Sequence, residues 1–316
     1  MSDAVVVQRL VKRYGAITAL DGISVEVAAG ELFGFIGPDG GGKTTLFRIL
    51  ATLLIPDEGT AAVLGRDVVR DLWALRREIG YMPGRFSLYG DLSVEENLRF
   101  FASVFGTTLE RERERIAPIY DQIAPFADRR AAALSGGMKQ KLALCCALVH
   151  RPRILLLDEP TTGVDAVSRR EFWDLLASLR AEGLTILVST PYMDEASRCS
   201  RVALVQRGGL LAVDTPAAIT GSFERPVLAV RAPDRYALMQ RLRGYPRVHR
   251  VYPFGTALHY TDRGTDDDAE IARALRAWLE EQGAYHVSVE PTPATIEDVF
   301  IDRMAVPEDA AVASAA

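Results

Sequence analysis

Apolar positions recur in two rhythms along this chain, in short runs with a period near two and in longer segments with helical spacing. In the first third, the runs AVVVQ, ISVEV and ELFGFIG predict strands, and the last leads through glycines into the helical KTTLFRILATLL. A helix (LALCCALV), a buried strand (RILLLDEP), an amphipathic helix (SRREFWDLLASLRAEG), a strand (LTILVST), a helix (YMDEASRC) and two strands about a Gly-Gly turn come later. Alternating strands and helices predict an α/β fold with a mainly parallel sheet.

The pattern changes at about residue 222. The runs PVLAV, RYALMQRL, RVHRVYP, ALHYT, AEIARALRAWLEEQG and YHVSVEP give a βαββαβ order, followed by the helical ATIEDVFIDRM. This order predicts a small ferredoxin-like α+β domain. We therefore expect a core domain over 1–221 with a helical insertion at about 87–150, a second domain over 222–303, and a disordered tail or linker over 304–316.

Composition narrows the class of protein. The chain has 316 residues, 48% of them hydrophobic, and a formal charge of −5, which argues against binding nucleic acid through a basic surface. The N-terminal MSDAVVVQRLVKRYG lacks the pattern of a secretory signal, and the apolar runs are far shorter than the ~20 residues that span a bilayer. Three cysteines, two of them adjacent in an apolar run, fit buried thiols in a reducing compartment. We expect a cytoplasmic protein that reaches a membrane through a partner.

The segment GPDGGGKTT fits the pattern G-x-x-x-x-G-K-S/T between a predicted strand and a predicted helix. In such a loop the glycines let backbone N–H groups turn inward, and the helix adds its positive end. Lys43 would reach the β- and γ-phosphates of a nucleotide, and the Thr44 hydroxyl would coordinate Mg²⁺. The predicted phosphate-binding residues are Gly37, Pro38, Asp39, Gly40, Gly41, Gly42, Lys43, Thr44 and Thr45.

Two further segments carry candidate chemistry. RILLLDEP is an apolar strand that ends in two carboxylates, of which Asp158 suits the Mg²⁺ shell and Glu159 suits a general base for an attacking water. In LSGGM, Ser135 can cap the next helix, and with Gly136 and Gly137 it offers donors to an anion. A generic helix start would need the cap but not the two glycines.

These motifs, with GVDAVS, stand in the order of Walker A, signature, Walker B and D-loop, and the chain resembles the nucleotide-binding subunit of an ABC transporter over roughly residues 5–217. The resemblance implies a P-loop NTPase core with an antiparallel β edge and a helical subdomain, which dimerises face to face around two MgATP. Ser135, Gly136 and Gly137 would then contact the ATP of the opposite unit, and Asp165 would act across the interface. Tyr14 would stack on adenine, although an ordinary half-buried tyrosine is the alternative.

The resemblance also suggests a partner and a role. The C-terminal PTPATIEDVFI is similar to segments that close export-type subunits, which favours efflux through an integral membrane permease. FSLYGDLSVEENL in the helical insertion is the expected contact surface. Together with STPYMDEA, this region resembles the first half of exporters that fuse two ATP-binding units. A homodimer, a heterodimer and half of a fused chain all stay open, as does the substrate.

Two positions depart from the family pattern. Gly84 replaces the glutamine expected after IGYMP, and Pro191 replaces the histidine expected after ILVST. We expect Thr190 to cap a helix that has Pro191 at its first position. Asp39 and Gly41, which replace asparagine and alanine, are expected to be tolerated, with Gly41 merely loosening the loop. These losses predict ATP binding with reduced hydrolysis; the alternative is a regulatory module that relies on a second, competent ATPase unit.

Overall fold

The computed structural model describes residues 3–85, 87–264 and 266–304. Its internal contacts divide the chain into two units. The larger unit extends to Pro216 and includes Arg303, and the smaller unit covers Ala217–Asp302. The two units divide after Pro216, the first residue of the short helix α7 (Pro216–Gly221). The domain boundary at residue 222 stays a prediction. The predicted tail lies outside the described residues, apart from Met304 at the end of a helix.

The larger unit is built on a six-stranded sheet in the order β10-β9-β3-β8-β7-β6. All neighbours run parallel except β9 and β10, which form the predicted hairpin. The strands β3 and β7 are buried along their whole length, as expected for central strands covered on both faces. The strands are β3 (Leu32–Ile36), β6 (Ile79–Met82), β7 (Ile154–Asp158), β8 (Thr185–Thr190), β9 (Arg201–Gln206) and β10 (Gly209–Asp214).

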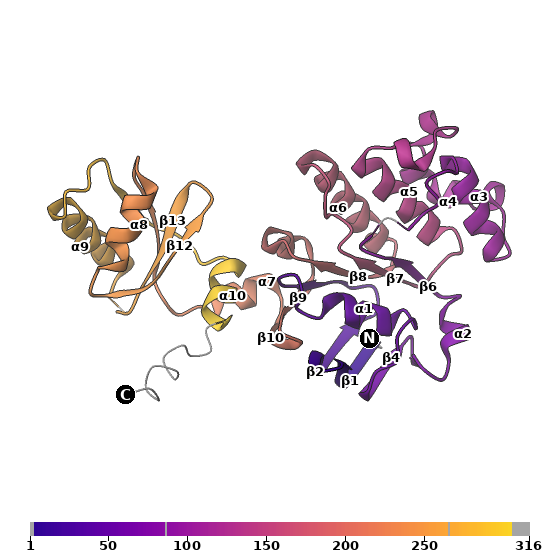
Figure 1. Cartoon of the computed structure of the whole chain (residues 1–316), viewed down its shortest axis with the longest axis horizontal. Helices are drawn as coiled ribbons and strands as arrows, with labels where there is room; N and C mark the ends of the chain where they lie inside the picture. Colours follow the sequence, from indigo (N-terminus) through magenta and orange to yellow (C-terminus); the bar gives the residue numbers. More distant parts are fainter. Residues whose placement is uncertain (1–2, 86, 265, 305–316) are drawn as a thin grey trace. The chain divides into compact units, whose positions relative to one another are not determined.

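A second sheet provides the antiparallel layer in the order β2-β1-β4-β5. It consists of β1 (Asp3–Tyr14), β2 (Ile17–Ala28), β4 (Glu58–Val63) and β5 (Arg66–Asp67). The helix α1 (Lys43–Leu50) lies between the two sheets (Figure 1). Its Phe47 and Leu50 pack in one core with Phe35 of β3 and Val63 of β4. This packing fixes the start of α1 directly after β3, where the phosphate loop is predicted.

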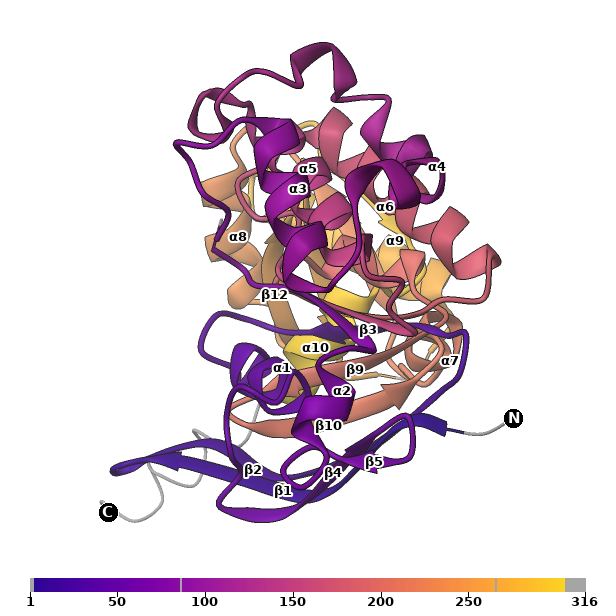
Figure 2. The ribbon, with the colours of Figure 1, turned by 90° about the vertical axis from the view of Figure 1, so that its right-hand side faces the viewer.

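Three helices lie within the predicted helical region and group to one side of the sheets (Figure 2). They are α3 (Val94–Val104), α4 (Leu109–Tyr120) and α5 (Gly136–Leu148). Helix α3 begins with a capping box, because the Ser93 hydroxyl accepts from Glu96 N while the Glu96 carboxylate accepts from Ser93 N. α2 (Leu72–Leu75) follows β5, and α6 (Ala166–Ala181) connects β7 to β8.

The smaller unit has the predicted βαββαβ order and a four-stranded antiparallel sheet, β12-β13-β11-β14. Leu238, Leu242, Leu275 and Tyr260 pack between this sheet and its helices, so the ferredoxin-like fold is confirmed. The elements are β11 (Val227–Arg231), α8 (Arg235–Arg243), β12 (Val248–Phe254), β13 (Ala257–Asp262), α9 (Asp268–Glu281), β14 (Ser288–Pro291) and α10 (Ile296–Met304).

Helix α10, predicted from ATIEDVFIDRM, carries a buried carboxylate. His259 Nδ1 lies 2.7 Å from Asp298 Oδ1, and Thr295 N donates to Asp298 Oδ2 at 2.6 Å. Burial alone raises the pKa of Asp298, but hydrogen bonds from His259, Thr295 and Tyr252 outweigh it and hold this pKa below its usual range. The C-terminal motif is therefore anchored to the small sheet by a charged hydrogen-bond network.

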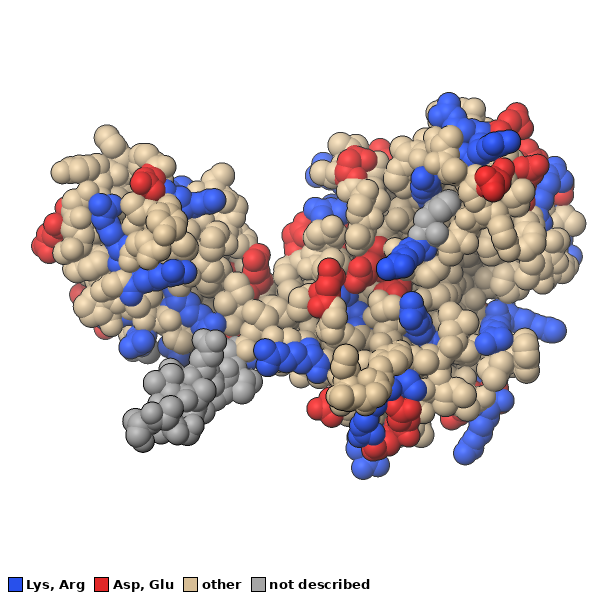
Figure 3. Space-filling model, in the orientation of Figure 1, with Lys and Arg blue, Asp and Glu red and all other residues tan. Residues whose placement is uncertain are grey.

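Within the described residues, no helix combines the length and apolar character that crossing a membrane requires. On the face of the molecule drawn in Figure 3, basic and acidic side chains are intermixed. This agrees with the mild formal charge of −5.

Candidate nucleotide-binding site

The predicted phosphate loop connects β3 to α1, and two of its glycines are required by close backbone contacts. A Cβ at Gly37 would lie 2.0 Å from Val205 O, and a Cβ at Gly42 would lie 2.3 Å from Ala19 O. Gly42 also has a φ of 101°, in the region that favours glycine. At Gly41 a Cβ would lie 3.0 Å from Pro38 O. Gly41 therefore relieves a tight contact, and the expectation that it merely loosens the loop is incomplete.

Lys43 is the first residue of α1 and is 3% exposed. Its Nζ donates to Gly37 O at 2.8 Å and to Pro38 O at 3.0 Å, and it lies 3.2 Å from Glu159 Oε1. The lysine thus lies inside the curl of the loop and beside the predicted general base. The structure brings these predicted site residues together although they are distant in sequence.

Thr44 and Asp158 form the second junction of the site. Thr44 Oγ1 donates to Asp158 Oδ1 at 3.2 Å across 114 positions of sequence. A hydroxyl and a carboxylate are hard oxygen ligands of the kind that Mg²⁺ prefers, and Mg²⁺ usually takes few protein ligands beside phosphate and water. Among the described residues, no group of three or more His, Cys, Asp or Glu side chains could hold a metal. The Thr44 hydroxyl and the Asp158 carboxylate form a donor pair that fits Mg²⁺ bound together with a nucleotide.

Glu159 follows β7 in an uncommon backbone conformation, with a φ of 50°. Ser189, which pairs with Asp158 in the sheet, holds it there. Glu159 N donates to Ser189 O and to Ser189 Oγ, each at 3.0 Å, and Ser189 Oγ donates to Asp158 Oδ1 at 2.6 Å. Sequence reasoning did not single out Ser189; its place at the end of a predicted parallel strand is the signal that could have found it.

The signature and D-loop segments pack against each other. Ser135 caps α5 by accepting from Met138 N at 3.3 Å, as predicted. A Cβ at Gly137 would lie 2.5 Å from Ser168 Oγ, at the start of α6. Asp165 caps α6 by accepting from Val167 N and Ser168 N. The glycine therefore permits close contact between the two segments, whose predicted roles toward a second unit stay predictions.

Tyr14 is the last residue of β1, and 45% of it is exposed. Lys12 Nζ lies 5.9 Å from the centroid of its ring. A substantial part of the side chain is therefore accessible to a ligand. Stacking on adenine stays a prediction.

The two departures from the family pattern lie at the carboxyl ends of β6 and β8. A Cβ at Gly84 would lie 3.1 Å from Asp158 O, so the chain passes close to the predicted metal ligand. After β8 a short helix is present in the predicted segment, but the predicted start, with Thr190 as its cap and Pro191 as its first residue, is wrong. A 3₁₀ helix, η3 (Met193–Arg198), begins two residues after Pro191, and the Thr190 hydroxyl accepts from Tyr192 N at 3.1 Å. The hydrogen bond to Thr190 closes a turn at Pro191 before the helix can start.

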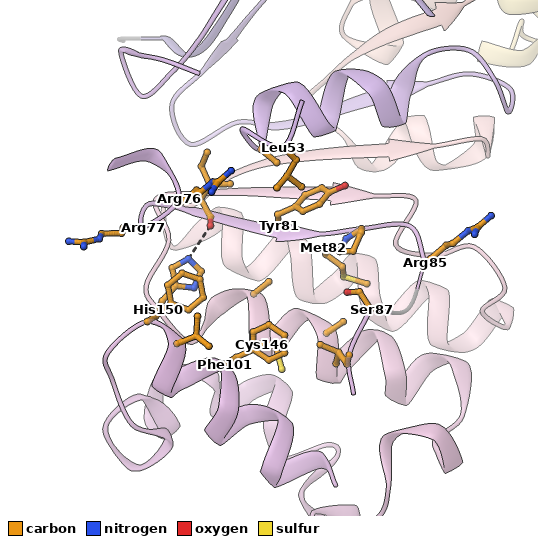
Figure 4. Close-up of a pocket in the computed structure, with 18 of the residues that line it drawn as sticks. Leu53, Arg76, Arg77, Tyr81, Met82, Arg85, Ser87, Phe101, Cys146 and His150 are labelled. Atoms are coloured by element: carbon orange, nitrogen blue, oxygen red, sulfur yellow. Dashed lines mark hydrogen bonds between the residues drawn. The ribbon is translucent and has the colours of Figure 1, made fainter. Parts of the chain in front are cut away.

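A cavity of about 940 Å³ separates the helical region from the sheet (Figure 4). Its polar lining includes His150, whose Nε2 lies 3.0 Å from Ile79 O and whose ring stacks on Phe105 with centroids 3.8 Å apart. Burial lowers the pKa of His150. Ser87 and Leu88 of the predicted contact surface line the cavity, whereas the first residue of that surface, Phe86, lies outside the described residues.

Comparisons with known proteins identify the family of this chain. A family model described as "ABC transporter" matches residues 20–162. The chain is 36% identical to Nod factor export ATP-binding protein I of Paraburkholderia xenovorans, covering 94% of this chain and 96% of that protein. It is 39% identical to the probable multidrug ABC transporter ATP-binding protein YbhF of Escherichia coli, covering 96% of this chain and 53% of that protein. The chain thus spans about half the length of YbhF.

Solved structures share the fold of the larger unit. The structure of cbiO1 from Clostridium perfringens, part of the ABC transporter complex cbiONQ, matches 70% of this chain and 92% of its own, with a TM-score of 0.63 and 26% identity. A dimeric post-hydrolysis state of the ATP-binding cassette MJ0796, bound to ADP and Pi, matches 67% of this chain and 98% of its own, with a TM-score of 0.61 and 26% identity. The chain is a member of the ABC transporter ATP-binding family, with relatives of export type.

Proposed function

We propose that this chain binds MgATP and hydrolyses it as the ATP-binding subunit of an export-type ABC transporter. The observation that carries the proposal is the junction of Lys43, Thr44, Asp158 and Glu159 at the ends of β3 and β7. It provides a buried cation, a pair of oxygen ligands and a general base within one small site.

In this proposal each side chain has one task. The loop N–H groups and Lys43 bind the phosphates, and Thr44 with Asp158 would hold Mg²⁺, which would offset charge on the β- and γ-phosphates. Glu159 accepts the proton of the attacking water. Its backbone is fixed by two hydrogen bonds to Ser189, so the carboxylate starts from a defined position.

Gly84 and Pro191 leave the water without two contacts that the family pattern supplies. A missing contact to developing charge costs ~10²–10³ in rate. We therefore propose that turnover is slow. A nucleotide-binding regulatory module without useful turnover is the second candidate, favoured by the same two residues, and Glu159 argues against it.

The complete site requires a second ATP-binding unit. The dimeric MJ0796 structure supports dimerisation. In a face-to-face dimer, Ser135, Gly136, Gly137 and Asp165 would act on the opposite unit's nucleotide. An identical chain, a different one, or a second half of a longer chain would each serve. A permease would place the assembly on the inner face of the cell membrane.

Release of phosphate from ATP by the purified protein tests hydrolysis, with Glu159→Gln as the matched control. This variant keeps the size of the side chain and removes the base. We expect turnover of the unaltered protein to exceed that of the variant by about 100-fold or more, at similar ATP affinity. Equal background rates in two proteins that both bind ATP would overturn the hydrolysis proposal and leave the regulatory one.

We also propose that the cavity beneath α3 receives a segment of the permease. Its rim carries exposed apolar groups, including Trp73 (75% exposed) and Val104 (60% exposed), with Arg76 lying 4.9 Å over the Trp73 ring. Val104→Asp should reduce co-purification of the permease with the tagged chain at least about fivefold, because it buries a charge on docking, and should leave basal turnover unchanged. Val69→Asp, at an exposed position outside the cavity, is the control. Equal recovery with both variants would exclude this surface.

A further inference from the structure

Glu195 is a buried carboxylate that takes no part in the chemistry proposed above. It belongs to η3 and is 3% exposed. Its Oε1 accepts from Thr161 Oγ1 at 2.9 Å, and its Oε2 accepts from Thr190 Oγ1 at 2.5 Å. Burying a carboxylate is costly unless its oxygens are paired, and both oxygens are paired here. The two partners come from the chain segments that follow β7 and end β8.

Thr161, the first partner of Glu195, lies in the chain segment that follows the proposed base Glu159. Thr161 follows Glu159 by two residues and is 2% exposed. Thr162 N donates to Glu159 O at 3.3 Å, which closes a turn around this position. Because Glu159 also bonds Ser189 through its own N–H, its backbone is held on both sides. The hydrogen bond from Thr161 to Glu195 therefore helps to hold the chain segment that positions Glu159.

The second partner controls the chain around Pro191. Thr190 O accepts from Gly37 N at 3.2 Å, which ties β8 to the start of the phosphate loop. The Thr190 hydroxyl accepts from Tyr192 N and donates to Glu195, so the backbone is fixed before and after the proline. One carboxylate thus joins the segment that follows the base to the segment that precedes the proline.

A third contact reaches the D-loop. Arg169 Nε lies 3.7 Å from Glu195 Oε1, and Arg169 Nη2 lies 3.0 Å from Asp194 Oδ2. Arg169 N donates to Asp165 O at 2.9 Å, in the first turn of α6. Arg169 therefore connects the D-loop, through Asp165, with the carboxylate of Glu195.

We propose that Glu195 is a positioning residue for ATP hydrolysis, an inference that rests on the proposed function. Its two oxygens join the segment after Glu159 to the segment before Pro191. With no polar side chain at Gly84 or Pro191 to help orient the water, the reaction depends on the exact place of Glu159, and Glu195 maintains it. The bond from the phosphate loop to Thr190 is made by the Thr190 carbonyl and not by the hydroxyl that Glu195 binds. The side chains of Lys43 and Thr44 contact the loop, Glu159 and Asp158 and not Glu195, so we expect the effect in kcat and not in ATP affinity.

The test compares Glu195→Gln with Asp194→Asn. Both replace a carboxylate by its amide on η3, and both carboxylates face Arg169, but Asp194 is exposed. In glutamine an NH₂ group replaces one of the two carboxylate oxygens, and because it can only donate, one threonine hydroxyl loses its acceptor. We expect Glu195→Gln to lower kcat at least about 10-fold, since small misplacements of reacting groups cost up to ~10², with KM and ATP affinity within about twofold. Asp194→Asn should match the unaltered protein.

A second variant keeps the inference falsifiable if Glu195→Gln folds poorly. Thr161→Val removes one hydroxyl at nearly constant volume. It should lower kcat by a smaller factor, and the double variant should be no slower than Glu195→Gln alone, because the two residues act through one contact. An unchanged kcat in Glu195→Gln, or a parallel loss of ATP affinity, would overturn the inference. If the unaltered protein is no faster than Glu159→Gln, the proposed function fails and this inference fails with it.

Discussion

Four strands end at the same edge of the central sheet, and they divide into two pairs of different chemistry. β3 and β7 lead into Lys43 and Glu159, which lie 3.2 Å apart. β6 and β8 lead into Gly84 and Pro191, which have no side-chain donor. In the proposed function the first pair would bind phosphate and supply the general base, whereas the second lacks the side chains that would orient the water. The difference implies that ATP affinity and hydrolysis rate can change independently in this protein.

The largest expected effect comes from a substitution in the first pair, Lys43 and Glu159. Lys43→Ala removes a buried cation with two hydrogen bonds to the loop. We expect ATP affinity to fall at least about 100-fold, since hydrogen bonds to charged groups contribute about 1.5–3 kcal/mol each. Titration calorimetry with MgATP measures this loss. Lys141→Ala, which removes a lysine paired with Glu171 on α6, should bind as the unaltered protein does; equal losses in both variants would show a general charge effect.

Pro191→His restores a side-chain donor to the second pair, Gly84 and Pro191. The Thr190 hydroxyl fixes the turn through Tyr192 N, so the backbone does not depend on the proline ring. An imidazole here would add a donor beside the γ-phosphate, and we expect kcat to rise about 10-fold with little change in ATP affinity. Single-turnover phosphate release measures the gain. Pro191→Ala is the control, and an equal rise in both variants would assign the effect to the backbone.

Gly84→Gln should give a smaller gain than Pro191→His. Its Cβ would lie 3.1 Å from Asp158 O, closer than ordinary contact, so β6 or β7 must shift by a few tenths of an ångström. We expect kcat to rise by less than about threefold, with a lower melting temperature, because overpacking against backbone is destabilising. Gly84→Ala separates the two effects, since it introduces the contact without the amide. A full 10-fold gain would show that the backbone yields easily.

The sequence was sufficient for the parts of the fold that depend on local patterns. The strand, glycine loop and helix around Lys43 were predictable because close backbone contacts demand glycine at Gly37 and Gly42. The βαββαβ order of the smaller unit was predictable because each of its strands and helices has its own apolar period. The junction of Thr44 with Asp158 followed from the family motifs and from the shared edge of parallel strands.

Contacts between distant segments were not predictable in this way. Ser189 and Glu195 read as ordinary strand-end and helix residues. The register of β7 and β8 reveals the partner of Ser189, and only the side-chain hydrogen bonds of the folded chain reveal those of Glu195. The helix expected at Pro191 was misplaced because Thr190 serves both the turn and Glu195. Its hydroxyl was therefore not available as a helix cap, which a one-dimensional pattern does not show.

The backbone of Glu159 has a consequence for how this protein could evolve. A φ of 50° costs a non-glycine residue about 1 kcal/mol, and a glycine would relieve it. Selection for heat resistance alone would therefore favour loss of the carboxylate. If the proposed function holds, retention of glutamate here exchanges some stability for a general base, whereas a relative without hydrolysis could take glycine at this position.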